Sequence, residues 1–238
     1  MLNENLNGKL EMFNFMHLFT LLVLISIIVL FYIFRNKISN DRFEKVFRIF
    51  MGFFLLTFES LFHIWIYSRG SYSLSMIPLT GFCALTNVVT IILLFTNKTK
   101  YFKYVIYYAL TGALFSLVFV DTPFGFPHFR YFHYFFVHFG FLLTSLYYYF
   151  TNRIEVSRKS YIISTIILFI YTQIVLIFDV LLHENWFYLI ENPIKEISDA
   201  LGNPWYTILW MIFNISFNYL WYIIIKRRKH DNHKVLRD

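Results

Sequence analysis

The apolar run LFTLLVLISIIVLFYIF, Leu18–Phe34, decides the class of this protein. It contains no charged residue, and the basic cluster Arg35-Asn36-Lys37 follows it directly. A hydrocarbon core about 30 Å thick needs roughly 20 mostly apolar residues for one helix to cross it. Because no basic region precedes the run, as one would in a secretory signal peptide, we expect a retained membrane anchor.

The rest of the 238-residue chain repeats this pattern, with 58% hydrophobic and 23% aromatic residues. Such a composition lies far outside that of soluble globular domains. We therefore predict an all-α, multi-pass protein of the cell membrane, built as one seven-helix transmembrane domain over residues 1–238. The predicted spans are Leu18–Phe34, Val46–Tyr67, Ile77–Phe95, Tyr101–Val120, Phe129–Phe150, Tyr161–Leu182 and Trp205–Ile225.

The basic residues predict an orientation. Of the 21 Lys and Arg residues, 17 lie in or beside the linkers after the first, third and fifth spans, or in the basic tail 226–238. The other four are Lys9, Arg69, Arg130 and Lys195. The positive-inside rule then places the N-terminus outside, the C-terminus in the cytoplasm and the segment 183–204 outside, where we expect a short interfacial helix or lid. Because these charges orient helices, the net charge of +7 indicates no nucleic-acid partner.

Polar residues gather in the outer halves of the predicted spans. Ionisable residues inside a bilayer are costly, so each is a candidate for function. Glu59 and His63 lie four residues apart and hence on one helical face. Asp121 ends the fourth span and Asp179 lies at the end of the sixth.

The third and fifth spans also carry polar stripes. Cys83 and Asn87 recur at helical spacing, which points both into a helix bundle. Arg130, Tyr134 and His138 fall within an arc of about 80°. We therefore expect the thiol of Cys83 and the imidazole of His138 to meet inside the bundle.

Several functions fit this set of residues. Histidines and carboxylates could assemble a zinc site for a metal-dependent lipid hydrolase, although His128, His133 and His138 are spaced by about 140° and cannot bind one ion from a single helix. An inward polar cluster could also belong to a non-enzymatic carrier or receptor. Against the carrier, we find no inverted repeat and no pair of broken spans.

Thiol-based acyl transfer is the third chemistry. Cys83, the only cysteine, could attack a lipid ester while His138 takes the thiol proton and Glu59 or Asp121 orients the imidazole. His128 and Arg130 at the rim could hold a phosphate.

Each of these candidate functional residues could instead have a purely structural role. A lone cysteine in a membrane helix is commonly a small packing residue, and a Glu–His pair can simply join two helices. We expect His17, His133 and His183, near the outer interface, to be solvated or to face headgroups.

Four segments carry a resemblance to a known family. IPLTGFCALTN (Ile77–Asn87), FGFPHFRYFHYFFVHFG (Phe124–Gly140), NWFYLIENP (Asn185–Pro193) and SDALGNPWYTILW (Ser198–Trp210) occur in this order. Together they resemble the YwaF-like family of bacterial integral membrane proteins. That family is similar to the vertebrate transmembrane protein 164 group, whose members act as cysteine-dependent acyltransferases on ether phospholipids.

The resemblance implies that Cys83 is a nucleophile and His138 its partner, in an enzyme that transfers or releases phospholipid acyl chains at the outer leaflet. We expect a membrane phospholipid as the partner, with no cofactor and no metal. The predicted supporting residues are Glu59, His63, Asp121 and Asn87, and the predicted substrate-binding residues are His128, Arg130, Tyr134 and Asp179.

Overall fold

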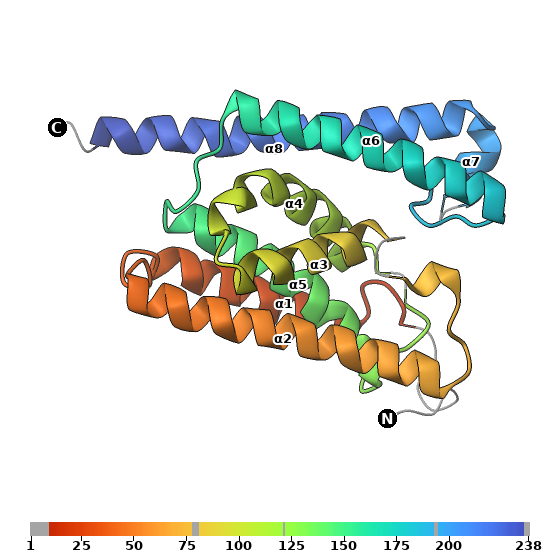
Figure 1. Cartoon of the computed structure of the whole chain (residues 1–238), viewed down its shortest axis with the longest axis horizontal. Coiled ribbons are helices and arrows are strands. Elements are labelled where there is room, and N and C mark those ends of the chain that lie inside the picture. The colour runs from red at the N-terminus through yellow and green to blue at the C-terminus, as the bar shows by residue number, and fades with distance from the viewer. Residues whose placement is uncertain (1–9, 78–80, 121, 193–194, 236–238) are drawn as a thin grey trace. The chain divides into compact units, whose positions relative to one another are not determined.

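The computed structural model describes residues 10–77, 81–120, 122–192 and 195–235, and every regular element in this part of the chain is a helix. In chain order they are α1 (Phe15–Ile33), α2 (Asp41–Ser68), η1 (Leu74–Met76), α3 (Phe82–Phe95), η2 (Thr99–Tyr101), α4 (Phe102–Val118), α5 (Phe129–Phe150), α6 (Arg158–Leu182), α7 (Lys195–Leu201) and α8 (Trp205–Val235) (Figure 1). Asp121, one of the predicted supporting residues, lies outside the described residues.

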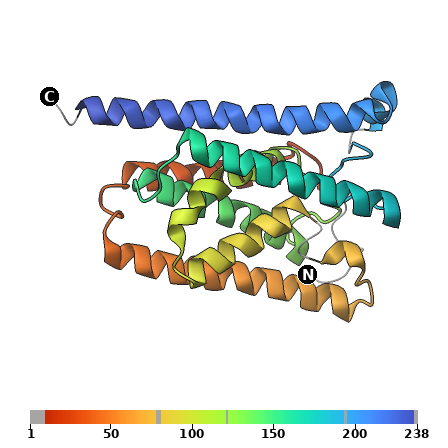
Figure 2. The ribbon, with the colours of Figure 1, turned by 45° about the horizontal axis from the view of Figure 1, so that its top comes forward.

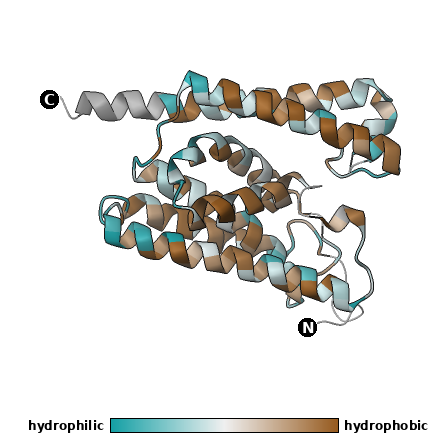
Figure 3. Ribbon diagram, viewed as in Figure 1, coloured by the Kyte–Doolittle hydropathy of each residue, from teal (hydrophilic) through white to brown (hydrophobic). Residues whose placement is uncertain are grey.

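Five of the described helical segments are long and apolar enough to cross a membrane. They are Phe15–Ile33, Asp41–Ser68, Thr99–Val118, Arg158–Leu182 and Trp205–Lys226, and hydrophobic residues predominate along them (Figure 3). The apolar α3 has 14 residues, and the 22-residue α5 is not among the five. The chain is therefore an all-helical, multi-pass membrane protein. The number of seven spans and their orientation stay predictions.

The helix ends follow local capping. α5 has the predicted bounds, whereas α2 and α6 begin earlier than predicted because their N-caps lie upstream. The side chain of Asn40 accepts a hydrogen bond from the Phe43 amide, and Ser157 and Ser160 form a capping box. α3 begins at Phe82, later than the predicted Ile77.

The chain divides into two compact units. Unit 1 comprises residues 1–72 and 86–155, and unit 2 comprises residues 73–85 and 156–238. Each unit has its own packing. The single domain over residues 1–238 stays a prediction.

In unit 1, α5 is the central helix. It packs against α1, α2 and α4 (Figures 1 and 2). Its aromatic side chains form much of the core: Phe135, Phe141, Tyr147 and Tyr148 are almost completely buried. A helix enclosed by its neighbours can carry histidine, arginine and tyrosine, because those side chains face protein.

In unit 2, α8 packs against α6 and α7. The loop after α6 is fixed to the start of α8 by hydrogen bonds, from Thr207 Oγ1 to the Leu189 carbonyl at 2.6 Å and from Tyr206 Oη to the Tyr188 carbonyl at 2.6 Å. α7 is the short helix that we expected in this segment. Its position outside the membrane stays a prediction.

The close approach of α2 and α5 depends on Gly140. A Cβ atom at this position would lie 2.5 Å from Cδ2 of Leu55 and 3.5 Å from Cε of Met51. Leu55 is completely buried, so it has little room to yield. The glycine therefore allows the two helices to pack closely.

We expect Gly140→Ala to lower the free energy of unfolding by about 1–3 kcal/mol, because the added methyl group overpacks the α2–α5 contact. Unfolding of the purified protein in mixed micelles measures this. Gly81→Ala is the control, since a Cβ atom there would meet its nearest neighbour, Ala84 Cβ, at an ordinary 3.6 Å. Equal stability of the two variants would contradict the close-packing role.

Candidate functional site

The polar centre of unit 1 is Glu59 on α2, whose side chain is buried. Its Oε2 accepts a hydrogen bond from Nδ2 of Asn87 on α3 at 2.9 Å, and its Oε1 lies 3.3 Å from Nε2 of His63, one turn further along α2. Asn87 is completely buried. The structure thus brings together three residues that the sequence predicts as a supporting group.

Two residues of α5 complete this cluster. Nη1 of Arg130 lies 2.7 Å from Nδ1 of His133, and Nε2 of His133 lies 3.8 Å from Oε2 of Glu59. Because an arginine N–H can only donate, Nδ1 of His133 is the acceptor and the proton of the neutral ring is on Nε2, toward Glu59. His133 thereby lies between the guanidinium and the carboxylate.

An aromatic ring holds Arg130 and His133 from one side. The Arg130 guanidinium carbon lies 4.2 Å from the centre of the Phe62 ring, and the His133 ring stacks on Phe62 at 4.6 Å between centres. A cation over an aromatic face is attracted by the ring quadrupole, most strongly where water is excluded. The polar cluster (Glu59, His63, Asn87, Arg130 and His133) therefore joins α2, α3 and α5.

The expectation that His133 is solvated or faces headgroups is wrong. Its exposed fraction is 8%, and it contacts both Arg130 and Glu59. The spacing contained the signal, since residues three apart on a helix are neighbours on its surface. The predicted stripe of Arg130, Tyr134 and His138, at spacings of four residues, did not include this nearer pair.

His17 is likewise buried, against the expectation of a solvated side chain. Its Nδ1 accepts from the Phe13 amide at 2.9 Å, and its Nε2 donates to the Leu117 carbonyl at 2.8 Å. The ring therefore links the start of α1 to the end of α4. His183, in contrast, is exposed, as expected.

His128 caps the N-terminus of α5. Its Nδ1 accepts a hydrogen bond from the Arg130 amide at 3.1 Å, and its ring stacks on Phe124 at 4.2 Å between centres. Burial, together with positive charges that include Arg130 and Arg69, lowers the pKa of His128. The neutral ring can therefore offer its lone pair to the helix end. Headgroup binding by His128 stays a prediction.

Tyr134 and His138 lie further along α5. Oη of Tyr134 donates to the Ser116 carbonyl on α4 at 2.7 Å. Nδ1 of His138 lies 2.7 Å from the Tyr134 carbonyl, which fixes the proton on Nδ1 and leaves the lone pair on Nε2. The Tyr134 backbone carbonyl thus orients the His138 imidazole through Nδ1, a role that we expected the carboxylate of Glu59 or Asp121 to have.

Unit 2 contains the other two predicted site residues. Cys83 lies half-buried in the first turn of α3. Asp179 is completely buried near the end of α6, where its Oδ1 accepts a hydrogen bond from the Trp186 amide at 2.9 Å. Asp179 therefore holds the loop that follows its own helix.

The described residues contain no group of three or more His, Cys, Asp or Glu side chains arranged to hold a metal ion. His63 and His133 each lie beside Glu59, at 3.3 Å and 3.8 Å from its carboxylate oxygens. In addition, the ring nitrogen that His133 turns toward Glu59 carries a proton, because Arg130 donates to the other nitrogen. The cluster is thus suited to internal charge pairing.

Comparison with known proteins gives a family for the chain. The family model for the TMEM164 family matches residues 11–225. The chain belongs to the TMEM164 family. No curated protein and no solved structure matches it.

The TMEM164 match spans both units and includes Glu59, Cys83 and His138. It supports the relation to the transmembrane protein 164 group that the four sequence segments indicate. The narrower YwaF-like label stays a prediction.

We expect Glu59→Ala to destabilise the protein by about 3 kcal/mol, because it removes the carboxylate that pairs with the half-buried Arg130 through His133. Glu59→Gln, which keeps the shape and an oxygen for Asn87, should cost less. Unfolding in mixed micelles measures both variants, with the exposed Glu11→Ala as the control. If Glu59→Ala were no less stable than Glu11→Ala, the cluster would have no stabilising role.

Proposed function

We propose that this protein is a membrane-embedded acyltransferase that uses Cys83 as nucleophile and His138 as general base on phospholipid acyl esters. The observation that carries the proposal is membership of the TMEM164 family over residues 11–225, a range that includes both residues. The transmembrane protein 164 group, which these sequence segments resemble, acts through a cysteine. The multi-pass helical fold is compatible with a lipid substrate.

The proposed reaction has two steps. Nε2 of His138 takes the thiol proton, the sulfur of Cys83 bonds to the ester carbonyl carbon, and the ester C–O bond breaks. The departing lysophospholipid oxygen takes the proton back from His138. In the second step the hydroxyl of an acceptor lipid attacks the thioester, its proton passes through His138 to the sulfur, and the acyl chain is transferred.

The described geometry of α5 supports the base. General base catalysis needs an imidazole nitrogen with a free lone pair and a fixed ring orientation. The contact between His138 Nδ1 and the Tyr134 carbonyl supplies both, because it commits the proton to Nδ1. The Tyr134 hydroxyl bonds to α4, which holds this part of α5 in place.

The polar cluster supports the nucleophile through α3. Cys83 lies four residues before Asn87 on this helix, and so about 6 Å along its axis and on nearly the same face. Asn87 is held by Glu59, and at the other end of α3 the Leu94 carbonyl accepts from Nη1 of Arg48 at 2.7 Å. Both contacts fix α3 to α2, so we assign Glu59 and Asn87 positioning roles.

The predicted substrate-binding side chains are already engaged within the protein. His128, Arg130, Tyr134 and Asp179 each have a partner within the protein. A phospholipid headgroup would therefore compete with these contacts. Arg130 is the cation among them and the one suited to a phosphate.

We also propose seven spans, with the N-terminus outside and the C-terminus in the cytoplasm. The central position of α5 within unit 1 explains how a helix with arginine and histidine can cross a bilayer. The distribution of 17 of 21 basic residues supports this orientation. A reporter enzyme that is active only in the cytoplasm should be active when fused after Asp238. Activity of an externally functional reporter at that position would reverse the topology.

The proposal predicts acyl transfer by purified protein in vesicles of labelled phosphatidylcholine and unlabelled lysophospholipid. We expect Cys83→Ala and Cys83→Ser to abolish transfer, and His138→Ala to lower its rate about 100-fold or more. The unfolding transition of each variant, compared with wild type, separates chemistry from folding. Unchanged transfer in Cys83→Ala would exclude the thiol mechanism. Release of free fatty acid without transfer would make the protein a lipase that uses the same site.

A carrier remains the second candidate, because buried carboxylates and histidines such as Glu59 and His133 are typical of proton-coupled transport. The same vesicles distinguish it. A carrier would move an anionic solute across the membrane equally well in wild type and Cys83→Ala, and would move no acyl chains.

A further inference from the structure

The ends of several helices meet at one end of unit 1 (Figures 1 and 2). Near the end of α5, Oη of Tyr148 donates to Oε1 of Glu44 in the first turn of α2 at 2.9 Å. The Tyr148 ring stacks on Phe102, the first residue of α4, at 4.8 Å between centres. Tyr32 of α1 lies edge-on to Phe150, the last residue of α5. The ends of α1 and α5 and the starts of α2 and α4 therefore lie together.

The acidic side chains at the start of α2 already have partners. Oδ1 of Asp41 lies 2.7 Å from Nη2 of Arg153, which follows α5. Oε1 of Glu44 lies 3.4 Å from Nε of Arg48. Arg48 also donates to the Leu94 carbonyl, which brings the end of α3 to the same place. Both carboxylates are thus paired within the unit.

Basic residues predominate at this end of unit 1. Segments 35–48, 98–103 and 151–155 contain nine Lys and Arg residues and three acidic ones, and hydrophilic residues gather where α1 ends and α2 begins (Figure 3). Five of the basic side chains are exposed and have no acidic partner in the described part of the chain. Together they form the basic patch: Lys37, Arg42, Lys45, Lys98 and Lys100.

The basic patch lies directly beside apolar helices. Arg42 and Lys45 are in the first two turns of α2, Lys98 and Lys100 flank the start of the apolar segment formed by η2 and α4, and Lys37 follows the end of α1 by four residues. Each of these three segments is long and apolar enough to cross a membrane. The patch is therefore at the depth where lipid headgroups meet a spanning helix.

Exposed aromatic rings accompany two of these cations. Nζ of Lys37 lies 5.5 Å from the centre of the Phe34 ring, and Nζ of Lys100 lies 5.4 Å from the centre of the Tyr101 ring. Both rings are exposed. Aromatic side chains favour the boundary between hydrocarbon and headgroups, and lysines there extend their ammonium groups toward the headgroups. This combination favours a lipid partner over a soluble anion.

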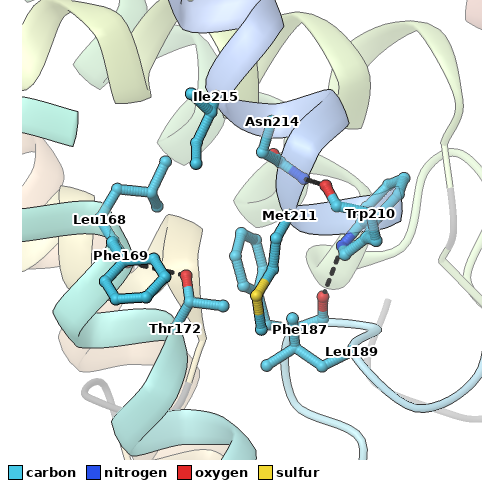
Figure 4. A pocket seen from close by; sticks show the side chains of 9 residues that line it. All are labelled: Leu168, Phe169, Thr172, Phe187, Leu189, Trp210, Met211, Asn214 and Ile215. Carbon is cyan, nitrogen blue, oxygen red and sulfur yellow. Dashed lines mark hydrogen bonds between the residues drawn. The ribbon is translucent and has the colours of Figure 1, made fainter. Parts of the chain in front are cut away.

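The small pocket of unit 2, between α6, α8 and the loop after α6, offers no comparable counter-charge. Uncharged side chains line it (Figure 4). Nδ2 of Asn214 donates to the Trp210 carbonyl at 2.8 Å, and Nε1 of Trp210 donates to the Phe187 carbonyl at 3.2 Å. These contacts belong to the packing of unit 2.

We propose that the basic patch binds phospholipids whose headgroups carry a net negative charge, in preference to zwitterionic ones. Lysine and arginine near a membrane surface attract anionic lipid, and several such residues act together. Their ammonium and guanidinium groups donate to the phosphate oxygens in charge-assisted hydrogen bonds. The bound lipids hold the starts of α2 and α4 at the membrane surface. This binding needs neither Cys83 nor acyl transfer.

Native mass spectrometry of the purified protein tests the patch. The protein is released from mixed micelles that contain equal amounts of phosphatidylglycerol and phosphatidylcholine with the same acyl chains, so that only the headgroup differs. Wild type should retain more phosphatidylglycerol. The triple variant Lys37→Gln, Lys98→Gln and Lys100→Gln should lower the ratio of bound phosphatidylglycerol to phosphatidylcholine about 10-fold or more. The matched control, with arginine at the same three positions, should keep the wild-type ratio.

Three results would overturn the inference. The first is equal retention of the two lipids by wild type, and the second is an equal loss of phosphatidylglycerol in the glutamine and arginine variants. The third is displacement of phosphatidylglycerol by inorganic phosphate at the same concentration, which would assign the patch to a soluble anion.

A salt titration of the wild type gives a test that does not depend on any variant folding. Raising the ionic strength from about 0.01 M to about 1 M shortens the screening length from about 30 Å to about 3 Å. The preference for phosphatidylglycerol should fall over this range, because the patch is exposed. A preference that salt does not change would contradict binding by these charges.

Discussion

The buried carboxylate of Glu59 is the constraint on which the arrangement of unit 1 depends. A charged group that is buried away from water must be paired and hydrogen-bonded. Otherwise the folded state is destabilised or the group becomes neutral by taking up a proton. Here the partners come from three helices: His63 from α2, Asn87 from α3, and Arg130 through His133 from α5. To satisfy one carboxylate, these helices must adopt one relative placement. Because the buried carboxylate is costly unless all these partners are in place, the cluster favours one specific arrangement of the helices of unit 1.

The three histidines at the start of α5 and along it, His128, His133 and His138, have three different structural roles. His128 precedes the helix and caps it, His133 connects a guanidinium to a carboxylate, and His138 presents an Nε2 lone pair because a carbonyl holds its Nδ1 proton. Each function follows from the atom that contacts Nδ1: an amide N–H, an arginine N–H or a carbonyl oxygen. The protonation pattern of a neutral imidazole is set by that single neighbour.

The sequence predicted the helices well because their apolar runs and caps are local features. The bounds of α5 were predictable, and so was the pairing of Glu59 with His63, since a spacing of four residues defines one helical face. The start of α3 was misplaced, because hydropathy continues through Pro78 and Gly81, where a helix is disfavoured. The burial of His17 and His133 was missed because it depends on contacts with other helices, Leu117 of α4 for the first and Glu59 of α2 for the second.

The central claim is that Cys83 carries the acyl chain as a thioester. Intact-protein mass spectrometry after brief incubation with phosphatidylcholine vesicles tests it directly. The account predicts an adduct with the mass of one acyl chain, located at Cys83, removed by neutral hydroxylamine and absent from Cys83→Ala. Acyl transfer that proceeds with no such adduct at any time, even after rapid acid quenching, would contradict it.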